Sequence, residues 1–191
     1  MGRRDRVRYT LSDQRGLEPL SEIDIRIILR AADEIISIAG RNMLTKILKG
    51  SKDKAILEHS LDQCPSYGMY AKLPNEEITR RIDWVILNHY LEISYNGRLP
   101  MIVFSEEGWE MYKPQYAEEL MVKILNVAEA DIDDLIAQLK ITNREVVVMI
   151  LSEIAESRNI GLIRFLERWE TVEVKKVRAI INETIGKLKS V

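Results

Sequence analysis

The sequence predicts a mainly α-helical fold with one β-hairpin: a winged helix-turn-helix followed by an α-helical C-terminal region. Two observations favour this fold class. Between Arg41 and Trp109 the expected elements are helix, short turn-rich helix, helix and hairpin, which is the order of a winged helix-turn-helix. From Glu106 onward, helical patterns follow one another with connections of about two to five residues, which favours antiparallel helix neighbours.

The composition is that of an ordinary folded protein without an overall charge that would attract nucleic acid. The chain has 191 residues, 46% of them hydrophobic, and a formal net charge of −2. A single cysteine, Cys64, excludes a disulfide framework within the chain and a zinc site built on several cysteines. No apolar run approaches the roughly 18 residues of a membrane span, so we expect a cytoplasmic protein without membrane contact.

Three segments are expected along the chain. Residues 1–20 form a basic N-terminal arm, residues 21–112 a winged-helix domain and residues 113–191 a C-terminal helical domain. The first eight residues hold four arginines and one aspartate, a local net charge of +3. These arginines are Arg3, Arg4, Arg6 and Arg8.

The first helix is expected over residues 21–39. Ser21 followed by Asp24 resembles a capping box, and Gly40 is a helix stop signal. Isoleucine and leucine cover much more than one stripe of this helix, so we expect it to be buried between two layers. The later helices of the winged-helix region are expected at 41–49, 55–61 and 75–87.

Local signals mark the ends of these later helices. Gly50 ends the helix over 41–49, and Asn75 caps the helix over 75–87. Asn88 then follows as a residue that tolerates the left-handed conformation.

The hairpin signal is Asn96-Gly97 between two apolar runs, which is typical of a two-residue type I′ loop. That loop would place Tyr95 opposite Arg98 and would put alternate apolar side chains on one face. The apolar face consists of Leu91, Ile93, Ile102 and Phe104.

Helical patterns fill the rest of the chain. They are expected at 106–111, 116–126, 130–140, 143–157, 161–169 and 172–188. Residues 143–147 and 172–178 are loosely similar in sequence and lie about 30 residues apart. This spacing suits a helical-pair repeat of the HEAT type. Two units leave a repeat and an ordinary helical module equally open.

The segment from about residue 22 to 112 resembles the RQC domain, the winged helix that follows the motor in RecQ DNA helicases. The resemblance lies in the order of short motifs: Leu48 to Lys52, Ser66-Tyr67-Gly68, Ile82 to Leu91, and Pro100 to Gly108. It implies a stand-alone winged helix that binds DNA. No P-loop is present, so no motor is expected, and the four-cysteine zinc module that precedes this domain in many RecQ helicases is missing. In that family the wing acts as a wedge between strands, and the tip here is only two residues long.

Ten residues are predicted to contact DNA. The densest basic stretch after the arm is Arg41 to Lys54, where hydroxyl and ammonium groups favour phosphate binding. The wing tip adds an aromatic ring and a guanidinium that can stack on or grip a nucleotide. The set is Arg41, Lys46, Lys49, Ser51, Lys52, Lys54, Arg80, Arg81, Tyr95 and Arg98.

The helix over 75–87 holds the position of a recognition helix, but its residues do not favour contact with DNA. Glu76, Glu77 and Asp83 would repel phosphates. Trp84 and Leu87 point away from the expected core face, so we expect the first helix or the C-terminal helices to cover them. Trp84→Ala should then cost on the order of 3 kcal/mol.

No catalytic, metal or cofactor site is expected, because His59 and His89 lack partners at ligand spacing and Cys64 lacks an activating neighbour. The leading hypothesis is a non-catalytic protein that recognises structured or branched DNA in replication, repair or recombination. Two alternatives stay open: a protein-interaction adaptor, and a dimeric winged-helix transcription regulator. The C-terminal helices are the candidate surface for a protein partner.

Overall fold

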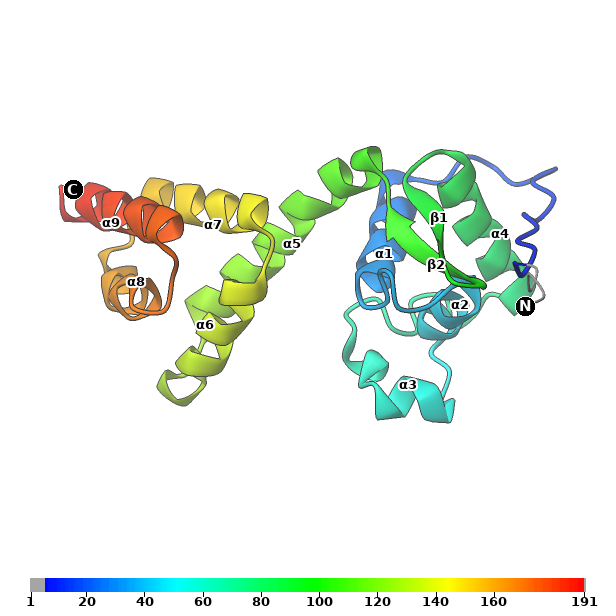
Figure 1. The fold of residues 1–191 in the computed structure, drawn as a ribbon, viewed down its shortest axis with the longest axis horizontal. Helices are drawn as coiled ribbons and strands as arrows, with labels where there is room; N and C mark the ends of the chain where they lie inside the picture. Colours follow the sequence, from blue (N-terminus) through cyan, green and yellow to red (C-terminus); the bar gives the residue numbers. More distant parts are fainter. Residues whose placement is uncertain (1–5, 191) are drawn as a thin grey trace, which may run out of the picture. The chain divides into compact units, whose positions relative to one another are not determined.

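The computed structural model describes residues 6–190 and shows a mainly α-helical chain (Figure 1). Within those residues the strands form one two-stranded antiparallel sheet, so the predicted fold class is confirmed. Arg3 and Arg4 lie outside the described residues. The chain divides into two compact units, the first ending at Tyr112 and the second beginning at Lys113.

Helix α1 (Glu22–Asp33) begins at the predicted capping motif. The Ser21 hydroxyl accepts a hydrogen bond from the Asp24 amide, and one face of the helix is buried in the first unit. The helix ends at Asp33 and not near residue 39, so the predicted end is wrong. The chain turns at Ser37, whose φ is 60°.

The segment after α1 leaves the helix because it bonds to the hairpin. The Ser37 amide donates to the Ile102 carbonyl at 2.8 Å, and the Ile102 amide donates to the Ala39 carbonyl at 2.9 Å. These two bonds satisfy backbone groups at the outer edge of the hairpin, where an unpaired strand would otherwise face water. They also fix the hairpin, at Ile102, to the segment that leads into α2.

The helix-turn-helix consists of α2 (Arg41–Lys49), α3 (Lys54–Glu58), a short 3₁₀ turn η1 (Leu61–Gln63) and α4 (Asn75–Leu87). Helices α2 and α4 pack against each other and against α1. The apolar side chains between them are fully buried, which makes this the core of the first unit. They include Ile28, Leu29, Leu44, Ile47, Leu48, Ile78, Ile82 and Val85.

Two of the three predicted helix-end signals need correction. Gly50 ends α2 in the left-handed conformation with φ 74°, as expected. Asn75 is the first residue of α4, and Pro74 is its N-cap without a side-chain bond. The left-handed residue after α4 is His89, with φ 63°, and not Asn88, whose φ is −94°.

The hairpin forms with a shifted register. Strands β1 (Leu91–Asn96) and β2 (Leu99–Phe104) place Tyr95 opposite Pro100, so Gly97-Arg98 is the loop and the predicted pairing with Arg98 is wrong. Gly97 has φ 60°, and Arg98 is not in the positive-φ region, a pattern that fits a type II′ turn. The shift is two residues, so every side chain keeps its predicted face.

The second unit is wholly helical in its described part. Helix α5 (Glu106–Asn126) begins in the first unit and continues through Pro114 into the second, so the predicted break is wrong. The remaining helices match the predicted ones with ends displaced by a few residues, and α9 packs on α7 and α8. They are α6 (Ile132–Ile141), α7 (Arg144–Ser157), α8 (Ile163–Glu170) and α9 (Lys175–Lys189), with 3₁₀ turns η2 (Glu129–Asp131) and η3 (Ile160–Leu162).

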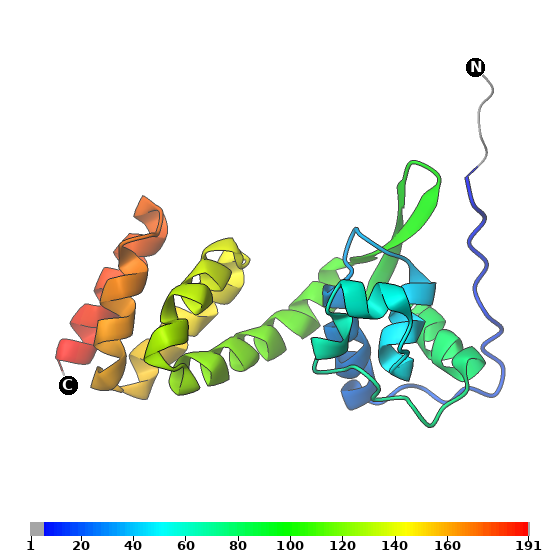
Figure 2. The same cartoon turned by 90° about the horizontal axis from the view of Figure 1, so that it is seen from below.

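Residues 6–20 form an extended segment without helix or strand, which we call the N-terminal strap. It runs beside the hairpin and then along α4 (Figure 2). The arm predicted over residues 1–20 therefore docks on the first unit over its described part. That contact decides which predicted site residues are accessible.

Candidate nucleic-acid interface

The strap is held on α4 by one buried carboxylate. Asp83 is fully buried and accepts hydrogen bonds from the Tyr9 hydroxyl (3.2 Å), the Ser12 amide (2.7 Å) and the Ser12 hydroxyl (2.6 Å). The fourth donor is the Arg41 guanidinium at 2.5 Å. A buried charge is tolerated only when it is paired and hydrogen-bonded, and these four donors meet that condition.

A stacked pair extends this cluster towards the hairpin. The Arg41 guanidinium lies over the Tyr9 ring, 4.6 Å from its centroid, and also donates to the Thr10 carbonyl at 3.1 Å. Burial and the neighbouring Asp83 charge raise the pKa of Tyr9 well above its ordinary value. The Arg41 side chain is therefore occupied by the protein itself, and only 21% of it is exposed.

Arg80 holds the strap one turn earlier on α4. Its guanidinium donates to the carbonyls of Asp13 (3.0 Å) and Arg15 (2.8 Å) and pairs with Glu77 at 3.2 Å. The Gln14 side chain returns a bond to the Arg80 carbonyl at 3.3 Å. The element over this face of α4 is the strap.

The predicted cover over the other outward residues is incomplete. Trp84 is half-buried, and Leu87 is 45% exposed, so the expectation that Leu87 is covered is wrong. Because Trp84 is only half-buried, the cost of Trp84→Ala should fall below the 3 kcal/mol expected for a buried tryptophan.

Arg81 also forms its ion pairs within the protein. It pairs with Asp24 (3.2 Å) and Glu77 (3.3 Å), and it lies 5.5 Å from the centroid of the Tyr70 ring. Burial opposes ionisation of Asp24, but hydrogen bonds from Ser21 and Tyr70 and the Arg81 charge together lower the pKa of that carboxyl. Arg80 and Arg81, the two predicted DNA contacts on α4, therefore hold parts of the protein together in this conformation.

The basic stretch after Arg41 is divided between structural and exposed groups. Lys49 donates to the carbonyls of Ala71 (2.7 Å) and Leu73 (2.8 Å), which ties α2 to the turn before α4. Ser51 caps the following turn, because its hydroxyl accepts from the Asp53 amide at 3.2 Å. These two predicted contacts hold the loop in place.

The other three lysines stand closer to solvent. Lys46 pairs with Asp53 at 2.8 Å, and that carboxyl has a lowered pKa because Lys46 donates to it. Lys54 pairs with Glu58 at 3.3 Å, with 85% of the lysine side chain exposed. Lys52 is exposed and makes no ion pair with the described residues. Exposed pairs of this kind contribute little to stability, so phosphates can compete for these cations.

The wing tip is joined to the strap. The Val7 amide donates to the Arg98 carbonyl at 3.1 Å, and the Tyr95 hydroxyl donates to the Val7 carbonyl at 3.2 Å. The Arg6 guanidinium lies 5.0 Å from the centroid of the Tyr95 ring. Arg6 therefore occupies one face of Tyr95 and adds a second exposed guanidinium beside Arg98.

The fold around this surface matches a known family. The model of the RQC domain covers residues 22–130, which is more than half of the chain. This chain belongs to the RQC domain family. Its RQC domain contains α1, the helix-turn-helix, the hairpin and α5.

One curated relative points the same way. The chain is similar to the ATP-dependent DNA helicase RecQ of Bacillus subtilis (strain 168), with 24% identity over 107 residues. This match covers 56% of the chain but only 18% of the helicase, so the chain spans less than a fifth of that relative. No solved structure matches the chain.

The RQC domain brings together some predicted residues and adds others. Tyr95 and Arg98 lie at the wing tip, whereas Arg80 and Arg81 lie under the strap or against α1. The sequence patterns did not indicate that Tyr9 and Ser12 donate hydrogen bonds to Asp83. The signal in the sequence for this contact was Asp83 itself, an aspartate of α4 whose neighbours Ile82 and Val85 are apolar.

Other kinds of site find no support in the described chain. Between residues 6 and 190 no three His, Cys, Asp or Glu side chains gather in a way that could hold a metal ion. Over the same residues, no helix is both long and apolar enough to cross a membrane.

Proposed function

We propose that this chain is a non-catalytic DNA-binding protein that uses its RQC domain to recognise structured or branched DNA. The observation that carries the proposal is the RQC match over residues 22–130, together with exposed cations on the wing and in the segment from Lys46 to Lys54. The RecQ relative is an ATP-dependent DNA helicase, and no P-loop occurs in this sequence. Replication, repair and recombination are the processes in which such DNA arises.

The contacts are proposed to come from two places. Lys46, Lys52 and Lys54 present ammonium groups for phosphates, and the wing presents Arg98 with Tyr95. Phosphate contacts fix position and orientation but carry no sequence information. Since α4 is covered by the strap, base edges in a major groove are not read by it in this conformation. Recognition should therefore depend on the shape of the DNA and not on its sequence.

A salt series tests this proposal. Fluorescence anisotropy with forked, duplex and single-stranded DNA of equal length should show tightest binding to the fork. Affinity should fall by about 0.9 log units per log unit of salt for each phosphate contacted. Undetectable binding to all three DNAs at low salt would overturn the proposal.

A protein-binding role for the second unit is the other candidate. Several apolar side chains are exposed on its described helices, and Val122 (60%) and Leu125 (53%) lie on one helix, α5. Exposed apolar side chains that gather in one place are typical of protein contact sites. An adaptor would bind its partner without DNA, and a Val122→Glu, Leu125→Glu variant would lose that partner but keep its DNA affinity.

A further inference from the structure

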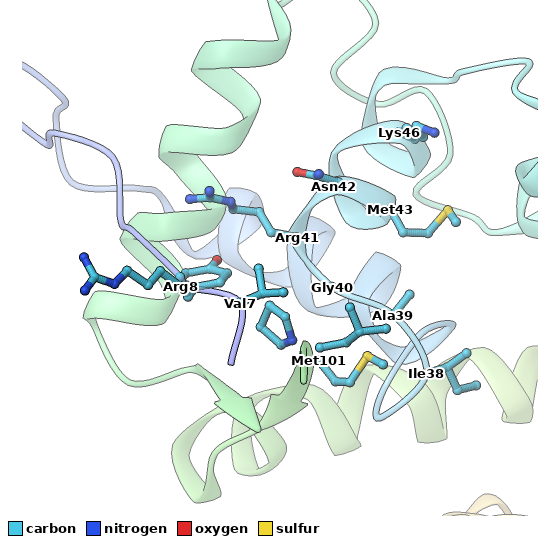
Figure 3. Close-up of a pocket in the computed structure, with 13 residues that line it drawn as sticks. Val7, Arg8, Ile38, Ala39, Gly40, Arg41, Asn42, Met43, Lys46 and Met101 are labelled. Carbon is cyan, nitrogen blue, oxygen red and sulfur yellow. The ribbon is translucent and has the colours of Figure 1, made fainter. Parts of the chain in front are cut away.

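A groove of about 510 Å³ opens beside the wing, between the strap, the loop before α2, the first turns of α2 and strand β2 (Figure 3). Ligand sites in proteins are typically about 300–1,000 Å³, so the groove is large enough for one nucleotide and too small for a stacked duplex. Three exposed apolar side chains of the first unit line it: Val7 (45%), Ile38 (72%) and Leu99 (55%). Exposed apolar side chains that gather in one place are typical of a binding site.

The walls of the groove are held by bonds that are already in place. Val7 is fixed by its amide and carbonyl to the wing tip, and residues 37–39 are fixed to Ile102. A Cβ at Gly40 would lie 2.6 Å from the Pro100 carbonyl oxygen, so only glycine allows this close approach of β2 to α2. The floor is therefore formed before any ligand arrives, which lowers the entropy cost of binding.

The lining chemistry is apolar inside and cationic at the rim. The sulfur-containing side chains Met43 and Met101 face the same space as Ile38 (Figure 3). Thioethers make favourable contacts with flat aromatic rings. The lining includes three cations, Arg8, Arg41 and Lys46, and no carboxylate.

The rim cations differ in how free they are. Arg41 is bound to Asp83, and Lys46 has an exposed pair with Asp53. Arg8 is exposed and makes no ion pair with the described residues. The α2 N-terminus lies at this rim, and its N-cap residue Gly40 has no side chain that could accept a hydrogen bond from the first-turn amides.

We propose that this groove binds one unpaired nucleotide of DNA, with its base on the apolar floor and its phosphate at Lys46 on α2. The inference rests on the proposed function and gives it a specific mechanism. A flat apolar ring joined to an anion matches a groove with an apolar floor, cations at the rim and no acidic lining. Base-paired nucleotides cannot enter, so the groove selects DNA ends or junctions that carry an unpaired nucleotide.

The test compares a blunt duplex with the same duplex carrying one unpaired nucleotide at one end. The full chain should bind the second DNA about tenfold more tightly, which corresponds to one stacked base. The fluorescent adenine analogue aminopurine at the unpaired position should change its emission on binding. The same analogue inside the duplex should not.

Ile38→Gln removes apolar surface from the groove without adding charge. It should abolish the tenfold preference and leave affinity for the blunt duplex within about twofold. Ile23→Gln is the matched control, because Ile23 is equally exposed (72%) but lies on α1 outside the groove. This control should keep the preference.

Three results separate the two proposals. Equal affinity of the wild-type chain for both DNAs, or equal loss in both variants, would overturn the groove assignment and leave DNA binding standing. An intact preference with unchanged aminopurine emission would also overturn it, because the nucleotide would then be held elsewhere. No binding to either DNA would instead remove the proposed function.

Discussion

Helix α4 and the segment from Lys46 to Lys54 both carry cations, but they differ in where those charges are used. On α4, Arg80 is bound to carbonyls of the strap, and Arg81 is paired with Asp24 and Glu77. In the segment from Lys46 to Lys54, Lys52 is exposed without an ion pair among the described residues, and Lys46 and Lys54 have only exposed pairs.

This difference shows that a cationic residue in the sequence is not always available to bind a ligand. A guanidinium that already bonds several buried or half-buried acceptors must give these up before it can bind a phosphate. An ammonium group in an exposed pair loses very little when it changes partner. Four measurements test whether the two sets of cations differ in this way.

The largest effect should come from the carboxylate that fixes the strap on α4. We expect Asp83→Ala to lower the free energy of unfolding by about 3–5 kcal/mol, because Arg41, whose side chain is only 21% exposed, loses its charged partner, and Tyr9 and Ser12 lose their acceptor. Urea unfolding followed by tryptophan fluorescence measures it. Glu76→Ala, at an exposed position of the same helix, should change stability by less than about 0.5 kcal/mol. Equal effects of the two changes would mean that the strap is not held as described.

The next effect concerns the salt dependence of DNA binding. Replacing Lys46, Lys52 and Lys54 together by Gln should reduce the slope of log affinity against log salt by about 2.7, which is three times 0.9. The double change of Arg80 and Arg81 to Gln should leave the slope unchanged, because both groups are tied internally. A slope that responds to the arginines and not to the lysines would reverse the comparison.

A smaller effect is expected at the wing. Tyr95→Ala together with Arg98→Ala should weaken DNA binding by about tenfold with the fold intact, as shown by an unchanged circular dichroism spectrum. Tyr95→Phe removes only the hydroxyl bond to the Val7 carbonyl and serves as the control for strap docking. Unchanged DNA affinity in the double variant would make the hairpin a part of the scaffold.

The smallest effect should be a loss of stability at alkaline pH. Burial, with the Asp83 charge for Tyr9 and a hydrogen bond to Asp24 for Tyr70, raises the pKa of both phenols in the folded state. A group with a raised folded pKa contributes stability that is complete below its unfolded value, near 10, and is lost as pH rises beyond it. Melting temperature should therefore fall more steeply above about pH 10 in the wild type than in a Tyr9→Phe, Tyr70→Phe variant. Parallel curves would contradict this account.

Local signals predicted the elements well where the bonds that end an element are themselves local. Helices α2 and α4 have the bounds expected from periodicity and from Gly50. The hairpin was placed by Asn96-Gly97, and its apolar face is as predicted because a shift of two residues preserves the alternation. Membership in the RQC family was also readable from the order of motifs.

The errors fall where distant residues compete with local preference. Helix α1 ends early because Ser37 and Ala39 bond Ile102, about 65 residues away in the chain. Helix α5 continues through Pro114 because buried residues on both sides, such as Tyr112 and Ala117, supply packing that outweighs one lost backbone bond.

Local patterns in the sequence were enough to predict the helical class, the wing and the residue types available for DNA. The tertiary structure alone decided which of them are accessible, because the strap brings Tyr9 and Ser12 to Asp83 across more than 70 positions of the chain. No periodicity reports that contact, since a buried carboxylate finds its donors in space and not at a fixed spacing. The same contact places Val7 and Arg8 beside the wing and so forms the groove.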